Sequence, residues 1–151
     1  MRENLSRFGF KPEIVVAETG PNLPFRDFFD TVVADVPCSG LGTLRRNPEI
    51  KWRFGPSEFP RLRKIQSGIL ESASEKVRKG GRLLYSTCST EPEENEFVID
   101  SFLARHPDFT MERPAAPDGV AAWIGKDGYV RTFPSTRRWD GLFAALLRRD
   151  P

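Results

Sequence analysis

A buried strand that stops abruptly in a turn is the feature that most constrains this chain. Residues 31–36 form a short apolar run rich in β-branched side chains, which is typical of a parallel strand covered on both faces. Pro37 ends the strand because it has no N–H group to donate to a neighbour. Since ligands bind beyond the carboxyl ends of strands in open parallel sheets, we expect Asp35, Cys38 and Ser39 to lie where such a fold keeps its chemistry.

A second strand end has the same character. Residues 82–86 form another mostly apolar run, and small polar residues and Cys88 follow it. Cys38 and Cys88 are the two cysteines of the chain, and each lies just past the carboxyl end of a predicted parallel strand. If the two strands are neighbours, the two thiols should lie close together.

The rest of the chain predicts alternating strands and helices, as in a doubly wound α/β sheet. A helix is expected from an N-cap at Ser57 to the glycine pair at 80–81, with apolar residues at helical spacing on one face. A second helix is expected from a capping box at Thr90 and Glu93 to about Arg105. The other expected elements are the end of a helix before Gly9, a short strand at 13–17, an irregular loop over 38–56, and a terminal antiparallel pair at 129–132 and 142–147.

Length and charge set broad limits. A chain of 151 residues is large enough for one domain with a single core, and a net charge of +2 is too small to indicate a partner by itself. The basic residues of the chain nevertheless gather after the first cysteine and near the end of the chain, where they form either solvated surface or contacts with RNA phosphates. The two clusters are Arg45, Arg46, Lys51, Arg53, Arg61, Arg63 and Lys64, and Arg137, Arg138, Arg148 and Arg149.

The sequence indicates neither a membrane-spanning segment nor a metal site. No apolar run approaches the length that spans a bilayer, and the first residues do not resemble a secretory signal. Two cysteines without an export signal favour the reduced cytoplasm as the location. With one His and two cysteines far apart in sequence, no metal-ligand cluster is predicted, and His106 before Pro107 is interpreted as a helix-end residue.

Several segments, taken together, carry a resemblance to a known family. They are 35–40 (DVPCSG) with Gly42 and Thr43, 45–52 (RRNPEIKW), 86–89 (STCS), 91–96 (EPEENE) and 139–145 (WDGLFAA). In residues, order and spacing they closely resemble the Sun/RsmB-type RNA cytosine-5 methyltransferases. The resemblance implies a Rossmann-like methyltransferase fold, with a mostly parallel sheet and a terminal antiparallel strand. It also implies S-adenosylmethionine as cofactor and RNA as partner.

The same resemblance implies that part of the catalytic domain lies upstream of this chain. In such a fold an initial strand and a glycine-rich turn approach S-adenosylmethionine, and an acidic residue after the next strand binds its ribose. Neither element precedes Glu13. Residues 1–151 are therefore expected to be the C-terminal portion of the domain, without the cofactor-binding half and the N-terminal RNA-binding domain.

The family assigns different roles to the two thiols. Carbon 5 of cytosine is a poor nucleophile, and adding a thiolate to carbon 6 activates it. The resemblance makes Cys88 this nucleophile and makes Cys38 the group that assists release of the methylated product. Asp35 is expected to face the base, where it can bond the exocyclic amine and a ring nitrogen, although a strand-end carboxylate can also simply accept backbone N–H groups.

The remaining candidates surround these three residues. Glu18, Asp35 and Pro37 are expected on the cofactor side, although the family usually has Asp where Glu18 stands. The expected contacts to base or RNA are Pro37, Ser39, Gly40, Arg45, Arg46 and Lys51, with backbone N–H groups of residues 39, 40 and 42 as donors. Trp52 fits either this substrate side or the core.

The target base must leave its stack, so single-stranded or loop RNA is the expected substrate. Small-subunit ribosomal RNA is the first expectation and transfer RNA the alternative. Two other classes stay open: a thiol-redox protein that uses both cysteines, although no Cys-x-x-Cys is present, and a non-catalytic RNA-binding remnant without the cofactor half.

Overall fold

The computed structural model describes residues 28–53, 55–115, 121–134 and 139–151, together with Arg7, Gly9, Leu23, Phe25 and Gly119. The strand expected at 13–17, the helix end before Gly9 apart from Arg7, and the candidate residue Glu18 lie outside this part of the chain, as do Arg137 and Arg138.

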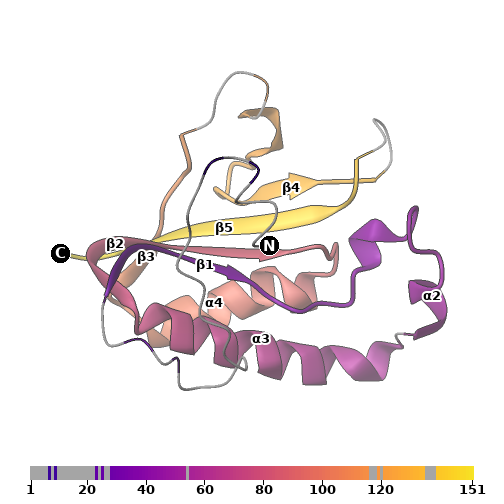
Figure 1. Cartoon of the computed structure of the whole chain (residues 1–151), viewed down its shortest axis with the longest axis horizontal. Coiled ribbons are helices and arrows are strands. Elements are labelled where there is room, and N and C mark those ends of the chain that lie inside the picture. The colour runs from indigo at the N-terminus through magenta and orange to yellow at the C-terminus, as the bar shows by residue number, and fades with distance from the viewer. Residues whose placement is uncertain are drawn as a thin grey trace.

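The described part is built on a mixed sheet with the strand order β1-β2-β5-β3, and β4 also pairs with β5 (Figure 1). The strands are β1 (Phe29–Asp35), β2 (Val77–Thr87), β3 (Phe109–Met111), β4 (Val130–Thr132) and β5 (Leu142–Arg149). Strand β1 runs parallel to β2, while β5 is antiparallel to β2, β3 and β4. The two predicted parallel strands are therefore direct neighbours, and the expected terminal antiparallel pair is confirmed.

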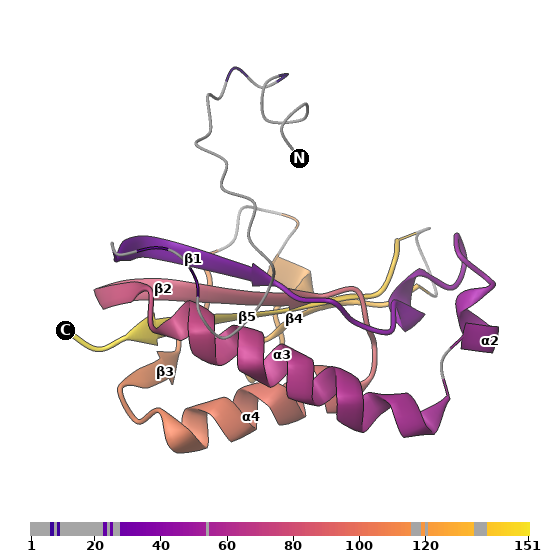
Figure 2. The same ribbon diagram turned by 60° about the horizontal axis from the view of Figure 1, so that its bottom comes forward.

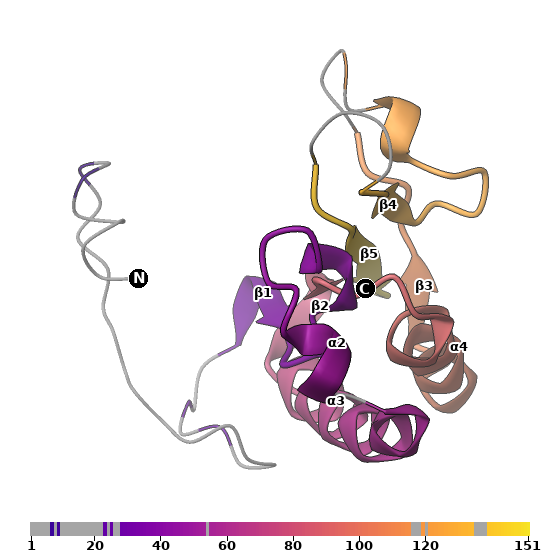
Figure 3. The ribbon, with the colours of Figure 1, turned by 90° about the vertical axis from the view of Figure 1, so that its right-hand side faces the viewer.

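Both long helices cover one face of this sheet (Figure 2). They are α3 (Phe59–Ser74) and α4 (Glu96–Arg105), and Figure 3 shows them below the strands in an end-on view. The core between the layers contains Leu70, Leu83, Tyr85, Phe102 and Phe143, each at most 2% exposed. Alternate residues of β1 point to the other face, where the side chain of Val33 is 61% exposed.

The prediction that the glycine pair at 80–81 closes the preceding helix is wrong, because the pair lies inside strand β2. Helix α3 ends at Ser74, and the chain turns into β2 at Val77, which pairs with Phe29. Gly80 has a φ of +69°, and the strand register shifts opposite it. The glycines therefore allow an irregularity in the backbone of β2. Pairing with β1 on both sides of this irregularity keeps residues 77–87 in one strand.

The capping box predicted at Thr90 and Glu93 is also wrong. A 3-10 turn covers Pro92–Glu94, and α4 begins later, at Glu96, with Asn95 as its N-cap residue. The Thr90 hydroxyl donates to Glu91 instead of capping a helix. The end of α4 at His106 is as predicted.

The loops contain elements that the sequence pattern did not indicate. A 3-10 turn at Leu41–Thr43 and the short helix α2 (Ile50–Arg53) occupy the segment expected to be irregular. Strand β3 lies between the second predicted helix and the predicted terminal pair, where the sequence pattern indicated no element. Among the described residues, no helix is long and apolar enough to cross a bilayer.

Candidate active site

The carboxyl ends of β1 and β2 bring the two cysteine motifs together. Asp35 and Ser86 are register partners, and the Ser86 hydroxyl donates a 2.8 Å hydrogen bond to Asp35 Oδ1. Three residues after Asp35 and two residues after Ser86, the Sγ atoms of Cys38 and Cys88 lie 3.0 Å apart. The proximity predicted for the thiols is therefore confirmed, across 50 residues of sequence.

A cavity of about 710 Å³ opens beside the two sulfur atoms. Asp35, Pro37, Cys38 and Cys88 all line it, together with apolar side chains from β1, β4 and β5. Two thiols and one carboxylate thus face a partly apolar space, which is the usual character of a small-molecule or base pocket.

The two thiols share a hydrogen bond that makes them chemically unequal. Donation from Cys38 lowers the pKa of Cys88 to about 7, while burial and the charges of Asp35 and Glu94 oppose this effect. The same hydrogen bond raises the pKa of Cys38 far above its ordinary value, and burial adds to the increase. The hydrogen bond therefore favours the thiolate form at Cys88 and the protonated form at Cys38.

A fully buried carboxylate connects the loops that carry these thiols. Glu94 is 0% exposed, and its two oxygens accept hydrogen bonds from residues of three different segments. Ser39 donates from the first cysteine loop, Ser89 from the second and Gln66 from helix α3. Sequence reasoning assigned no role to Glu94 beyond its place in the motif segment 91–96.

Gln66 is the second buried polar residue that the sequence analysis missed. It occupies the apolar face of α3 between Leu62 and Leu70, and it donates to the Pro37 carbonyl (3.0 Å) and to Glu94 Oε1 (2.9 Å). A polar residue at a position where the helical period demands an apolar one was the available signal. Its amide holds the strand-end proline in place.

Two glycines allow the first cysteine loop to pack closely. Gly40 has a φ of +75°, in the left-handed region. Gly42 donates its N–H to the Cys88 carbonyl (3.0 Å) and accepts from the Gly141 N–H (2.8 Å). A side chain at Gly42 would collide with these neighbours, since a Cβ atom would lie 2.1 Å from the Gly141 oxygen.

With this geometry established, comparison with known proteins decides the family. The family model described as 16S rRNA methyltransferase RsmB/F matches residues 1–148. The chain belongs to the RsmB/F methyltransferase family. The resemblance noted in the sequence motifs is thereby confirmed.

Individual relatives agree with this assignment. Ribosomal RNA small subunit methyltransferase B of Sodalis glossinidius is 35% identical over 152 residues, which cover 99% of this chain and 33% of that protein. The corresponding protein of Salmonella arizonae is 33% identical over 147 residues, covering 96% and 32%. The chain spans about a quarter to a third of the length of the curated relatives it matches.

Solved structures confirm the Rossmann-like α/β fold. NSun6 from Pyrococcus horikoshii, crystallised with SFG, superposes with a TM-score of 0.79 at 26% identity and covers all of this chain and 38% of its own. A methyltransferase homologue from the same organism superposes with a TM-score of 0.74 at 29% identity, covering 98% and 48%.

Some backbone groups expected to bind the base are engaged inside the protein. The Ser39 N–H donates to Glu94 Oε1 at 2.8 Å, and Ser39 is 2% exposed. The Gly42 N–H is bonded to Cys88, as described above, and the Gly40 N–H points to the Cys38 sulfur, where it partly offsets the rise in the pKa of that thiol. These residues therefore shape the loop rather than present free donors to the cavity.

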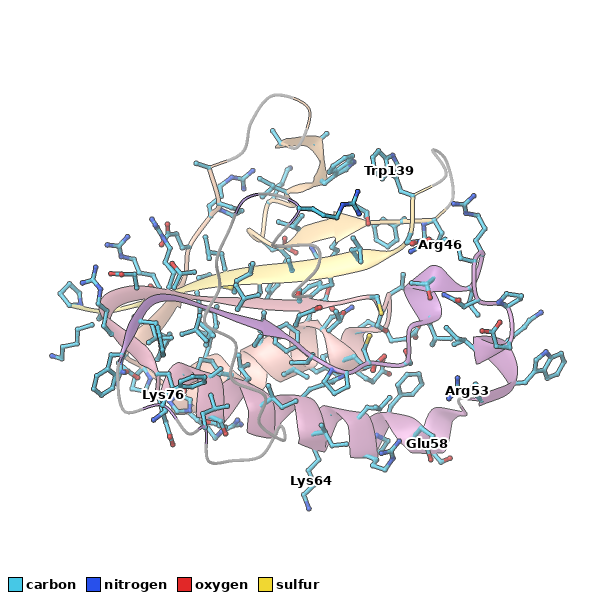
Figure 4. All side chains as sticks on the ribbon, viewed as in Figure 1. Arg46, Arg53, Glu58, Lys64, Lys76 and Trp139 are labelled. Atoms are coloured by element: carbon cyan, nitrogen blue, oxygen red, sulfur yellow. The ribbon has the colours of Figure 1, made fainter. Side chains whose placement is uncertain are left out.

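Of the basic residues after the first cysteine, Arg45, Arg46 and Lys51 are exposed and differ in their contacts, whereas Arg63 is partly buried and donates to the Phe97 carbonyl and the Ser101 hydroxyl. Arg46 forms an ion pair with Asp140, and Figure 4 shows Arg46 and Trp139 on the same side of the molecule. Lys51 lies over the ring of Trp52, which is 86% exposed, so the alternative that Trp52 belongs to the core is wrong. Arg45 is exposed in the same loop.

The other basic residues have structural partners or point elsewhere. Arg148 and Arg149 form ion pairs with Glu112 and Asp108, which favours a structural role for them. Lys64 projects from α3 away from the sheet (Figure 4). His106 bonds Glu71 and stacks on Phe102, so it acts as a helix-end residue. No cluster of His, Cys, Asp or Glu arranged for a metal occurs within the described ranges.

Proposed function

We propose that this chain supplies the catalytic thiols of an RNA cytosine-5 methyltransferase that acts on small-subunit ribosomal RNA. The observation that carries the proposal is the 3.0 Å thiol pair at the edge of a cavity that Asp35 also lines. Two relatives named as small-subunit ribosomal RNA methyltransferases support the RNA class. The use of S-adenosylmethionine is supported by NSun6, which was solved with SFG, an analogue of that cofactor.

Cys88 is the nucleophile in this mechanism. Its lowered pKa makes about half of the molecules thiolate near pH 7, and the sulfur faces the cavity. The thiolate adds to carbon 6 of cytosine, the sulfur–carbon bond forms, and the electron pair of the 5,6 double bond moves toward carbon 5. Asp35 faces the ring from the neighbouring strand end, where its carboxylate stabilises a proton on the ring nitrogen as the thiolate adds.

When bound, S-adenosylmethionine would supply the methyl group that carbon 5 takes up, and S-adenosylhomocysteine would be the leaving group. Asp35 and Pro37 form a cavity wall that fits the positively charged sulfonium end of the cofactor, because the Asp35 carboxylate would attract that charge. Glu18, proposed for the adenine side, completes the candidate cofactor residues of this chain.

Cys38 acts in the second half of the reaction. While Cys88 is a thiolate, Cys38 keeps its proton because it donates to that sulfur. Once Cys88 is bonded to carbon 6, it is no longer an anion that accepts from Cys38, the pKa of Cys38 falls, and the Cys38 proton passes to solvent in the cavity. The Cys38 thiolate can then take the proton from carbon 5, the 5,6 double bond reforms, and Cys88 leaves as thiolate.

The test uses the full-length protein with ribosomal RNA, transfer RNA and a tritiated methyl donor. Cys38→Ala is expected to trap a covalent protein–RNA adduct, and further replacement of Cys88 should abolish it. Reversed phenotypes would overturn the assignment of the two roles. Methylation of transfer RNA alone would replace the substrate, and the absence of both methyl transfer and adduct would favour a non-catalytic RNA-binding segment.

A further inference from the structure

The chain contains a buried residue that touches neither the cavity nor the sulfur atoms but bonds both loops that carry them. Glu94 Oε1 accepts from the Ser39 N–H (2.8 Å) and from the Gln66 amide (2.9 Å). Glu94 Oε2 accepts from the hydroxyls of Ser39 (2.5 Å) and Ser89 (2.6 Å). Ser39 directly follows Cys38 in sequence, and Ser89 directly follows Cys88.

We propose that Glu94 is a positioning residue that fixes the two cysteine loops relative to each other, so that the Cys38 thiol can donate to the Cys88 sulfur. The inference deepens the proposed function, because it rests on Cys88 acting as the nucleophile. The two loops are about 50 residues apart in sequence. Besides the sulfurs, the Gly42 N–H bonds the Cys88 carbonyl (3.0 Å) and the Ser39 and Ser89 hydroxyls lie 3.3 Å apart, and the Glu94 carboxylate accepts three further hydrogen bonds from the two loops.

The chemistry of the contacts explains why this position needs a carboxylate. All four groups around Glu94 are hydrogen-bond donors, and an ionised carboxylate is an acceptor with room for about four of them. A Gln amide at this position would present two N–H donors to groups that donate. The hydroxyls of Ser39 and Ser89 already accept from the backbone N–H groups of Leu41 and Glu91, so the amide of a Gln would compete with these donors for the same oxygens.

The rest of the segment holds Glu94 itself in place. Tyr85, a core residue of β2, donates its hydroxyl to the Glu94 carbonyl. The next residue, Asn95, accepts from the Thr87 hydroxyl at 2.6 Å and donates to the Ser89 carbonyl at 3.0 Å. The carboxylate is thus anchored to the end of β2, the strand that carries Cys88, and from there it reaches across to the loop of Cys38.

The direction in which the pKa of Cys88 changes when Glu94 is replaced shows whether Glu94 positions the loops or acts only through its charge. The negative charge of Glu94 raises the pKa of Cys88, so removing the charge without moving the loops should lower that pKa. Loosening the loops should instead weaken the hydrogen bond from Cys38, which is the main cause of the lowered value, and raise the pKa. The two effects point in opposite directions.

The experiment measures how the alkylation rate of Cys88 by iodoacetamide depends on pH in the full chain, with peptide-resolved mass spectrometry. Glu94→Gln is expected to move the midpoint from about 7 upward by about one pH unit or more. The matched control is Glu93→Gln, the same chemical change at a partly exposed neighbour, and its midpoint should stay in place.

Ser89→Ala serves as the second variant, because it removes one of the four donors and keeps the Glu94 charge buried. Its midpoint should also rise, by less than in Glu94→Gln. A midpoint that falls or stays constant in Glu94→Gln, or in Ser89→Ala where Glu94→Gln does not fold, would overturn the proposal. This result is distinct from failure of the proposed function, which would appear as absence of an RNA adduct while the thiol titration behaves as expected.

Discussion

Replacing Cys38 with Ala should change the acidity of Cys88 by a calculable amount. The hydrogen bond from Cys38 is the largest influence on Cys88, and it lowers the pKa from an ordinary 9.0 to about 7. Burial and the charges of Asp35 and Glu94 act in the other direction. Without the donor, the pKa of Cys88 should therefore return to 9 or above, and the thiolate fraction at pH 7 should fall from about one half to about 1%, a loss of about 50-fold.

The alkylation rate at pH 7 should fall by much less than the thiolate fraction. A thiolate of higher pKa is intrinsically more nucleophilic, and with a Brønsted slope of about 0.4–0.5, two pKa units restore about six- to ten-fold. The net loss of rate is then about five- to eight-fold. The pH midpoint, which should move by about two units, is consequently the sharper quantity to measure.

The assay follows carbamidomethylation of the Cys88 peptide from about pH 5 to about pH 10. Cys38→Ser is the matched control, because its hydroxyl can still donate to the sulfur and should give an intermediate midpoint. Cys88→Ala removes the largest cause of the raised pKa of Cys38, so Cys38 should react at lower pH than in the unaltered chain, as its proposed role as a base requires. A midpoint that remains near 7 in Cys38→Ala would refute the hydrogen bond as the cause.

Three further outcomes are expected. Gly42→Ala should lower the free energy of unfolding by about 3 kcal/mol in denaturant titrations, because its Cβ would meet the Gly141 carbonyl. Gly55→Ala should be nearly neutral, since nothing lies within 4 Å of its Cβ. Equal losses in the two variants would contradict the packing argument. Trp52→Ala should weaken RNA binding in filter assays by roughly ten-fold or more without changing thermal stability, while Phe97→Ala on α4 should leave RNA binding unchanged. The 151-residue chain alone should bind S-adenosylmethionine too weakly for calorimetry, and a Kd of about 1 μM or lower would contradict this.

The sequence predicted those parts of the fold that local patterns determine. The apolar run before Asp35 and the second run before Cys88 are a parallel pair, as expected, and their neighbouring ends bring the thiols together. The glycine pair at 80–81 was misinterpreted because a glycine after an apolar helical period looks the same whether it closes a helix or bends a strand. The pairing of Val77 with Phe29 decides between them, and it involves a segment 48 positions away (77 minus 29).

The candidate site was predictable only where family motifs marked it. Cys38, Cys88 and Asp35 meet at one cavity, but Glu94 stands in an acidic segment whose composition is typical of a solvated surface. Its burial results from donors on Ser39, Gln66 and Ser89, which no local pattern links to it. Nonlocal hydrogen bonding, rather than local propensity, determines its environment.

A negative charge so close to a thiolate would by itself work against catalysis. The charges of Asp35 and Glu94 both raise the pKa of Cys88, yet the value is lowered overall because the neighbouring thiol donates to the sulfur. A short hydrogen bond therefore outweighs two charges that act over longer distances. If Glu94 holds the loops that make this bond, its unfavourable charge and its favourable geometry are two effects of one side chain, and the geometry dominates. The arrangement also gives the proposed reaction its order, because Cys38 is kept protonated as long as Cys88 is a thiolate and becomes available as a base only after Cys88 has been consumed.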